Sequence, residues 1–204
     1  MSDFENKIHD DVRGIFKSAW TETKGQVVPK SEDLGLSNVG RSISATILYA
    51  DIDGSTQIVD RYDAKFAAEV YKAFLLCATR VIRLNGGEVR SFDGDRVMGV
   101  FIGDSKNSDA AKTGLQINYL VKKAINPALK DQYTSTKFSL RHTVGIDTSE
   151  MLVVRSGIRN NNDLVWVGSA ANHAARMNSL SSDFATRLTP AIYKKLNEKS
   201  KFGG

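Results

Sequence analysis

The sequence predicts an α+β domain in which an antiparallel sheet carries helices on one face. Three observations indicate this class. A run of apolar and β-branched residues ends at Asp51, an Asp-Gly pair at 93–94 separates two short extended runs, and helix-spaced apolar segments alternate with these strands. Hydrophobic residues make up 41% of the 204 residues, which is enough for a core. The element order β-α-α-β-β-α-β-β-α-β-α favours one sheet packed against helices.

The first 41 residues are predicted to lie outside the main domain. Apolar residues recur at helical spacing over 3–20, which predicts an amphipathic helix that packs on its own domain or on a partner chain. Residues 21–41 contain Pro29, glycines and scattered polar side chains and are typical of a linker. The main domain is therefore expected over 42–204.

The elements of the main domain follow from apolar spacing and from turn residues. A long helix is expected over 63–84 and should end at Asn85-Gly86-Gly87. Two short strands then meet at the 93–94 pair, which places Asp95 at or just after the tip of a hairpin. The later elements are expected as a helix over 107–126 followed by Pro127, extended segments over 138–157, a strand over 164–167, a helix opening after Gly168, a strand near 185–188 and a helix from Thr189-Pro190.

Composition and charge exclude several classes of protein. The 28 basic and 23 acidic residues give a net charge of +5, but they are interspersed and show no aromatic-basic stacking pattern, so no nucleic-acid partner is expected. No apolar run approaches the roughly 18 residues of a membrane span, and residues 1–20 are too charged for a signal peptide. We therefore expect a soluble cytoplasmic protein with no membrane partner. The single cysteine, Cys77, excludes an internal disulfide.

The stretch ILYADIDGST at 47–56 is the strongest candidate for a site. It is typical of a buried strand that delivers the Asp51 carboxylate to its C-terminal edge, followed by a turn and a helix start. Ser55 or Thr56 is expected to cap that helix, and the backbone N–H groups around Gly54 would face a phosphate. The alternative is a junction in which the acidic residues serve only the turn.

A second carboxylate is expected near the first. Asp51 and Asp95 end neighbouring extended segments, so both point into one space if the first strand lies beside the hairpin. Such a pair can hold two divalent ions, one activating an attacking oxygen and the other neutralising phosphates. The alternative is ordinary turn chemistry at the hairpin.

A third feature is the stretch GSAANHAARM. Asn172 and Arg176 are four residues apart and therefore share one face of a helix. An amide and a guanidinium placed in this way can orient a sugar and stabilise charge that develops on a phosphate. The alternative is an exposed helix whose arginine makes surface salt bridges.

In this order and spacing, these features resemble the class III nucleotidyl cyclases, the adenylate and guanylate cyclase family. The matching stretches are ADIDGST, GGEVRSFDGDRVMGVF, HTVGIDTSEM and WVGSAANHAARM, and the resemblance spans roughly Ser42 to Leu196. It implies that 42–204 is a catalytic domain with a ferredoxin-like, palm-type fold. It also implies a head-to-tail homodimer in which each site is composed from both subunits. The implied reaction is attack by the 3′-oxygen of a nucleoside triphosphate on its own α-phosphorus, which releases pyrophosphate.

The resemblance also implies a role for each matching residue. Asp51 and Asp95 correspond to the aspartates that bind two divalent cations, Mg²⁺ or Mn²⁺, and Ile52 would lend its backbone carbonyl to one ion. Asn172 corresponds to the asparagine that orients the ribose, and Arg176 to the arginine that stabilises the transition state. The lysine that holds the terminal phosphates has no clear counterpart, and the weak candidates for it are Lys199 and Lys201.

The chain departs from the family at the residues that recognise the base. The two purine-reading positions are Ser91 and Val165, and neither matches the adenine or the guanine pattern. Tyr49 and Arg96 are bulky residues able to hydrogen-bond, and they could fill the space of a purine and recognise a smaller base. In this the chain looks like the bacterial antiphage pyrimidine cyclases, which make cyclic UMP or cyclic CMP for a receptor encoded elsewhere. The alternative is an ordinary cyclase with relaxed purine recognition, in which these two residues only pack and form salt bridges.

Three other classes fit the sequence less well. The strand followed by DxDG also resembles haloacid-dehalogenase-type phosphatases, with Asp51 as nucleophile and Asp53 as acid, but the second acidic motif is missing where it is needed. A calcium loop lacks its final glutamate, because position 62 is a tyrosine. A non-catalytic nucleotide-binding domain would be expected to lack at least one of Asp51, Asp95, Asn172 and Arg176, and all four are present.

Overall fold

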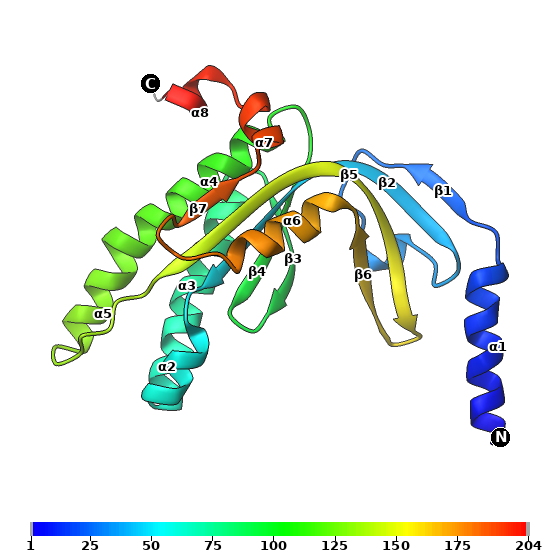
Figure 1. Ribbon diagram of the computed structural model, residues 1–204, viewed down its shortest axis with the longest axis horizontal. Helices are drawn as coiled ribbons and strands as arrows, with labels where there is room; N and C mark the ends of the chain where they lie inside the picture. Colours follow the sequence, from blue (N-terminus) through cyan, green and yellow to red (C-terminus); the bar gives the residue numbers. More distant parts are fainter. Residues whose placement is uncertain (1, 203–204) are drawn as a thin grey trace. The chain divides into compact units, whose positions relative to one another are not determined.

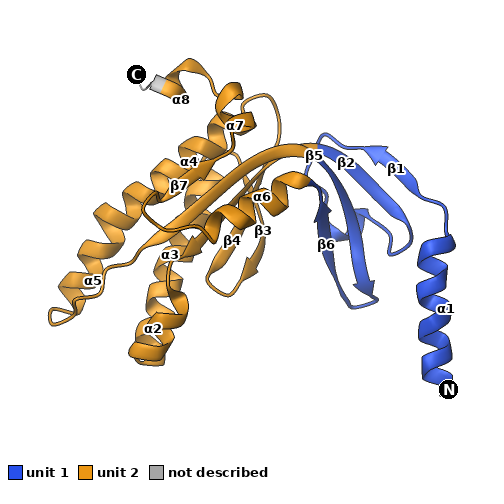
Figure 2. Ribbon diagram, in the orientation of Figure 1, with its two compact units in different colours: residues 1–43, 150–168 blue, residues 44–149, 169–204 orange. Residues whose placement is uncertain are grey.

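The computed structural model of the chain describes residues 2–202 (Figure 1). Contacts within the chain divide it into two compact units (Figure 2). The smaller unit comprises the chain up to residue 43 together with 150–168, and the larger unit comprises 44–149 and the residues from 169 onward. Two long strands, β2 (Val39–Ile52) and β5 (His142–Ile158), contribute residues to both units.

The sheet of the larger unit has β2 and β5 at its centre. Its strand order is β3-β4-β2-β5, with β7 beside β5. β3 (Glu88–Asp93) pairs antiparallel with β4 (Arg96–Phe101), which pairs antiparallel with β2. β7 (Thr186–Leu188) pairs in parallel with β5. The hairpin predicted at 93–94 is therefore confirmed, whereas the short β7 makes the sheet mixed.

The smaller unit adds short elements to the ends of the two long strands. β1 (Thr21–Lys24) pairs in parallel with the start of β2, and β6 (Asn161–Val167) pairs antiparallel with the second half of β5. A 3-10 turn lies at Ser31–Asp33. The segment expected as a linker, 21–41, thus contains a strand, a helical turn and the first residues of β2. The boundary between residues 41 and 42 stays a prediction.

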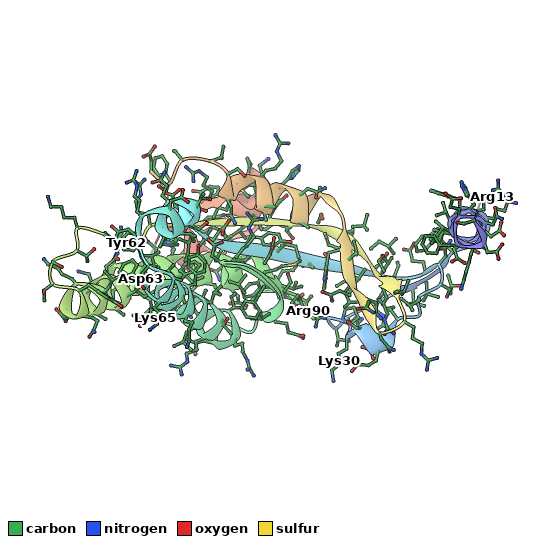
Figure 3. The ribbon with its side chains drawn as sticks, turned by 90° about the horizontal axis from the view of Figure 1, so that it is seen from below. Arg13, Lys30, Tyr62, Asp63, Lys65 and Arg90 are labelled. Atoms are coloured by element: carbon green, nitrogen blue, oxygen red, sulfur yellow. The ribbon has the colours of Figure 1, made fainter. Side chains whose placement is uncertain are left out.

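Helix α1 (Asp3–Lys17) begins the smaller unit and is shorter than the predicted 3–20. It starts with a capping box between Ser2 and Glu5, and it ends at Ser18, whose backbone is extended. The Asn38 side chain donates to two carbonyl oxygens at this end, at 2.8 and 2.9 Å. No residue of α1 is buried within the described chain, and Arg13 marks its exposed surface in Figure 3.

The remaining helices belong to the larger unit. They are α2 (Ser55–Arg61), α3 (Ala64–Leu84), α4 (Lys106–Leu120), a π-helical turn (Val121–Ile125), α5 (Asn126–Gln132), α6 (Ser169–Asn178), α7 (Pro190–Lys195) and α8 (Glu198–Phe202). α3 begins at Asp63, whose carboxylate accepts from two backbone N–H groups, and this start is marked in Figure 3. It ends as predicted, with Gly86 in the left-handed region at φ 78°. Across residues 2–202, no helix is both long and apolar enough to span a membrane.

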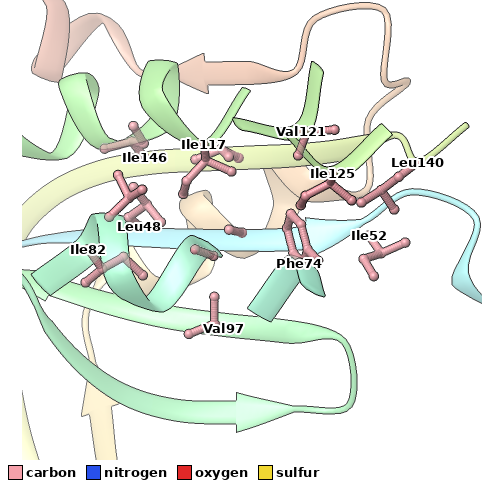
Figure 4. Packing of buried hydrophobic residues seen from close by; sticks show 14 of the residues in the cluster. Leu48, Ile52, Phe74, Ile82, Val97, Ile117, Val121, Ile125, Leu140 and Ile146 are labelled. Carbon is pink, nitrogen blue, oxygen red and sulfur yellow. The ribbon is translucent and has the colours of Figure 1, made fainter. Parts of the chain in front are cut away.

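The core lies between one face of the sheet and helices α3 and α4. Alternate residues of β2 point into it, and Leu48 and Ala50 are fully buried there. They pack with Phe74 of α3 and Ile117 of α4 in a single cluster (Figure 4). Because side chains alternate along a strand, Tyr49 and Asp51 are left on the opposite face of β2.

Helix α6 lies on that opposite face, unlike α3 and α4. Val144 and Ile146 of β5 point into the core, so Gly145 points the other way. A Cβ atom built on Gly145 would lie 2.1 Å from the carbonyl oxygen of Ala174, so only glycine allows α6 to approach β5 this closely. The sequence predicted that the helices cover one face of the sheet. In the larger unit α3 and α4 do so, whereas α6 lies on the other face.

Pro127 does not end the helix that precedes it. The chain passes through the π-helical turn into α5, where Pro127 lies in the first turn. A proline is tolerated there because the first N–H groups of a helix have no partner within the helix. The Asn126 side chain bonds both backbone groups of Leu140, which holds this junction against the start of β5.

His142 is a buried histidine at the start of β5. It is 3% exposed, and its ring lies 5.9 Å from that of Phe74. Burial, with a smaller effect from the positive charge of Lys122, lowers the pKa of His142 to about 4. The folded protein therefore holds this imidazole neutral at pH values where an unfolded chain would protonate it.

We predict that stability falls between pH 6.5 and pH 4 because of His142. Above pH 6.5 the imidazole is neutral in both the folded and the unfolded state. Between pH 6.5 and about pH 4 the unfolded state binds a proton that the folded state does not, so the free energy of unfolding falls as the pH falls. The loss should reach about 3 kcal/mol, from about 1.4 kcal/mol per pH unit. Urea unfolding of the wild type and of His142→Leu between pH 7.5 and pH 4 measures it. His9→Gln, at an exposed site, is the control. Parallel pH curves for the wild type and His142→Leu would contradict the prediction.

Candidate active site

The first site element is the face of β2 opposite the core, near the C-terminal end of the strand. Tyr49 and Asp51 lie there because their neighbours Leu48, Ala50 and Ile52 are buried in the core. The Asp51 side chain is 15% exposed. A carboxylate this well shielded from water needs a partner charge.

The second element is the turn between β3 and β4. Gly94 has φ 59°, a left-handed value that glycine adopts without strain, and Asp95 is the second residue of this two-residue turn. The Oδ2 atom of Asp95 is buried and has no hydrogen-bond partner within residues 2–202. An unpaired buried carboxylate oxygen is costly and indicates a missing cation or donor.

Arg96 is the partner of Asp51. The register that pairs Ala50 with Val97 places Arg96 beside Asp51 on the neighbouring strand. The guanidinium donates from Nε at 3.0 Å and from Nη2 at 2.7 Å, both to Oδ2 of Asp51. It also lies over the ring of Tyr49, with Cζ 5.9 Å from the ring centroid.

The electrostatics at Asp51 favour a cation. Burial raises the pKa of Asp51, the hydrogen bonds and charge of Arg96 oppose that rise, and the nearby Asp95 carboxylate adds to it. Burial also raises the pKa of Tyr49, so its phenol stays protonated at neutral pH. Two neighbouring carboxylates, of which only Asp51 is paired with the arginine, form a site that a divalent ion would stabilise further.

Two of the residues expected to recognise the base, Tyr49 and Ser91, lie in a row across three strands. Tyr49 of β2 lies opposite Met98 of β4, which in turn lies opposite Ser91 of β3. The Tyr49 hydroxyl contacts the Met98 sulfur at 3.4 Å. The structure therefore places Met98, a residue that the sequence alone did not single out, between Tyr49 and Ser91, while Arg96 lies over the Tyr49 ring.

The start of α2 differs from the prediction in its cap. Neither Ser55 nor Thr56 caps the helix, because Gly54 takes the N-cap position with φ 74° and no side chain bonds the first turn. Ser55 instead accepts, through its carbonyl oxygen, a hydrogen bond from the Tyr71 hydroxyl at 3.3 Å. The predicted turn between Asp51 and the helix is present, and the Ile52 side chain anchors it in the core.

Asn172 and Arg176 lie on the exposed side of α6, as their spacing predicted. Neither side chain has a hydrogen bond or an ion pair with any residue from 2 to 202. Within the described chain they are therefore not joined to the carboxylates of Asp51 and Asp95. Val165 lies on β6, in the smaller unit, and is 44% exposed.

The donor set fits divalent ions only in part. In residues 2–202, no three side chains of His, Cys, Asp or Glu gather around one point. The Asp51 and Asp95 carboxylates nevertheless supply hard oxygen ligands, and the unpaired Oδ2 of Asp95 is ready to accept a cation. Mg²⁺ commonly binds through one or two carboxylates plus substrate phosphates, so two carboxylates suit it.

One cluster was missed by sequence reasoning. Asp147 on β5 is 3% exposed and accepts hydrogen bonds from His173 of α6 and from Thr189. The signal was present in the sequence, since an aspartate between Ile146 and Thr148 interrupts a strand-forming run. A buried aspartate in such a run requires polar partners from elsewhere in the chain.

The fold and these motifs define a class of enzyme. Residues 38–203 match the family model described as the adenylate and guanylate cyclase catalytic domain. The chain therefore belongs to the class III nucleotidyl cyclase family, and it is a nucleotidyl cyclase, a phosphorus–oxygen lyase.

Two similar proteins have names that specify a base. The chain is 46% identical over 188 residues to the uridylate cyclase of Xanthomonas perforans, a match that covers 92% of this chain and 81% of the relative. It is 47% identical over 189 residues to the uridylate cyclase of Burkholderia cepacia, with 92% and 82% covered.

Solved structures confirm the fold. The guanylyl cyclase Cya2 superposes with a TM-score of 0.70 at 19% identity, covering 78% of this chain and 81% of that one. The predicted α+β, palm-type cyclase fold is confirmed by this likeness.

Proposed function

We propose that this chain is a pyrimidine cyclase that converts UTP, or CTP, to the 3′,5′-cyclic monophosphate and pyrophosphate. The main support for this reaction is the pair of neighbouring carboxylates, Asp51 at the end of β2 and Asp95 in the β3–β4 turn, with one buried oxygen of Asp95 unpaired within residues 2–202. The two similar proteins named uridylate cyclases support the choice of base and favour UTP.

The metal site would use Asp51, Asp95 and the backbone carbonyl of Ile52. Two Mg²⁺ or Mn²⁺ ions bound there would activate the 3′-oxygen and neutralise the phosphates. Gly54, Ser55 and Thr56 would hold phosphate oxygens through backbone N–H groups, which no side-chain cap occupies. Asn172 would orient the ribose, and Arg176 would stabilise charge on the reacting phosphorus centre.

Base recognition would depend on Tyr49 and Arg96, beside Ser91, with Val165 as the second position inferred from the resemblance. The protonated Tyr49 hydroxyl and the Arg96 guanidinium are donors that suit the carbonyl oxygens of a pyrimidine. A metal ion bound at Oδ2 of Asp51 would compete with Arg96 for that oxygen, and ion binding there would release the guanidinium toward the base. In this proposal Arg96 links base recognition to metal binding.

A head-to-tail homodimer would complete the site. Asn172 and Arg176 are exposed and have no partner within residues 2–202, as expected if they act on a nucleotide held by the carboxylates of another subunit. Neither nucleic acid nor a membrane takes part in the proposed reaction. We further propose a cytoplasmic role in antiphage defence, through a cyclic-nucleotide receptor encoded elsewhere, which rests on the resemblance alone.

The reaction is tested by product analysis. With Mn²⁺ and separate ATP, GTP, CTP and UTP, mass spectrometry should detect a cyclic pyrimidine product, mainly cyclic UMP. Asp51→Asn should lower kcat about a hundredfold or more, because it removes a charged metal ligand. Asp53→Asn, two residues away, is the control and should retain most of the activity. Cyclic AMP or GMP as the main product would refute the pyrimidine assignment, and no product from any nucleotide would favour a non-catalytic nucleotide-binding domain.

The composite site is tested by mixing inactive variants. Asp51→Asn and Arg176→Ala should each be inactive, yet co-expressed subunits should recover about a quarter of the wild-type activity, because half of the dimers carry one intact site of two. Asn172→Ala co-expressed with Arg176→Ala should recover nothing, since both changes affect the same half. Failure of the first pair to recover activity would contradict the shared site.

The competition between the metal ion and Arg96 for Asp51 is tested by measuring metal binding in the absence of nucleotide. A hydrogen bond to a charged group contributes about 1.5 kcal/mol or more, so Arg96→Met should tighten Mn²⁺ binding about tenfold. Electron paramagnetic resonance titration of Mn²⁺ measures this. Arg141→Met, which removes an exposed arginine paired with Asp53, is the matched loss of one charge and should change the affinity little. Equal affinities for the wild type and Arg96→Met would show that the ion does not compete with Arg96.

A further inference from the structure

The face of β5 opposite the core packs against α6. Four alternate residues of β5 contact it in order, and they are Thr143, Gly145, Asp147 and Ser149. The Thr143 hydroxyl donates to the Asn178 carbonyl oxygen at 3.3 Å, and the Ser149 hydroxyl accepts from the Ala170 N–H at 3.1 Å. These two contacts hold the ends of the helix through its backbone.

Asp147 holds α6 through a side chain at its middle. Its Oδ2 lies 2.8 Å from Nδ1 of His173, and its Oδ1 accepts from the Thr189 hydroxyl at 2.5 Å. Both carboxylate oxygens are thus engaged, and the Asp147 side chain is 5% exposed. A buried carboxylate with two donors has a fixed orientation, and a histidine bonded to it is fixed as well.

The position of His173 on the helix makes this contact a rotational restraint. At about 100° per residue, the buried residues Ala170 and Ala174 define the side of α6 that faces β5. Asn172 and Arg176 lie on the far side, and His173 lies at the edge between the two. The backbone contacts at the two ends and the close approach at Gly145 hold the helix against β5, and the His173–Asp147 bond adds a side-chain restraint on its rotation.

We infer that Asp147 and His173 are positioning residues that aim Asn172 and Arg176 at the nucleotide. The inference rests on the roles proposed above for those two residues. His173 would act through the helix and would not touch the substrate. Because a displacement of about 1 Å can cost as much as a hundredfold in rate, loss of this one bond should be visible in kcat.

The test compares two substitutions of His173, one that keeps a side-chain N–H able to bond Asp147 and one that does not. His173→Asn keeps a side-chain N–H near the position of Nδ1, and His173→Leu removes it. We expect His173→Leu to lower kcat about tenfold with little change in KM, and His173→Asn to retain most of the rate. The double variant His173→Leu/Asp147→Asn should lose no more than the worse single variant, because both changes break the His173–Asp147 contact and an amide oxygen at position 147 can still accept from Thr189. His9→Leu, at an exposed histidine of α1, is the control.

A second measurement does not depend on turnover. Hydrogen exchange of the α6 backbone, residues 169–178, should speed up in His173→Leu and stay near the wild-type rate in His173→Asn. Unchanged exchange and unchanged kcat in His173→Leu would overturn the inference, as would multiplying losses in the double variant.

Arg176→Ala in the same series separates this inference from the proposed function. If Arg176→Ala is inactive while His173→Leu is fully active, only the positioning role fails. If Arg176→Ala is fully active, the proposed role of the α6 face fails first.

Discussion

The antiparallel register between β2 and β4 is the constraint on which the candidate site depends. It pairs Ala50 with Val97, both buried in the core, and so leaves Asp51 and Arg96 side by side on the other face. A slip of one residue would turn Asp51 into the core and bring an apolar side chain to the site. The apolar face of β2, packed on Phe74, therefore holds the carboxylate in place, and core packing and site geometry have the same cause.

The ion pair of Asp51 with Arg96 shows how one side chain can serve two purposes. Without a cation, the guanidinium neutralises a shielded carboxylate whose isolated charge would be costly. The same group lies over Tyr49, where the proposal places the base. A cyclase with a small residue at this position would need another partner for its aspartate. In this proposal, one arginine would link recognition of a small base to protection of the metal ligands.

The two faces of β5 have different roles in the larger unit. One face, with Val144 and Ile146, completes the core, and the other carries α6 through small or polar residues. Gly145 permits the close approach, and Asp147 fixes the rotation. The helix presents an amide and a guanidinium that find no partner in the described chain, which agrees with a site shared between subunits. Stability and the proposed dimeric chemistry therefore depend on alternate residues of a single strand.

Local spacing and turn chemistry were enough to predict the strand near Asp51, the hairpin at Gly94 and the shared helix face of Asn172 and Arg176. The sequence-based prediction was wrong about the cap of α2, where Gly54 takes the N-cap position, and about Pro127, which lies in the first turn of a further helix and does not end the helical segment. Only the tertiary structure decided that Arg96 binds Asp51, that Met98 lies between Tyr49 and Ser91, and that Asp147 meets His173. These contacts join residues far apart in the chain, and their register follows from how the sheet and helices pack together, which no local pattern encodes.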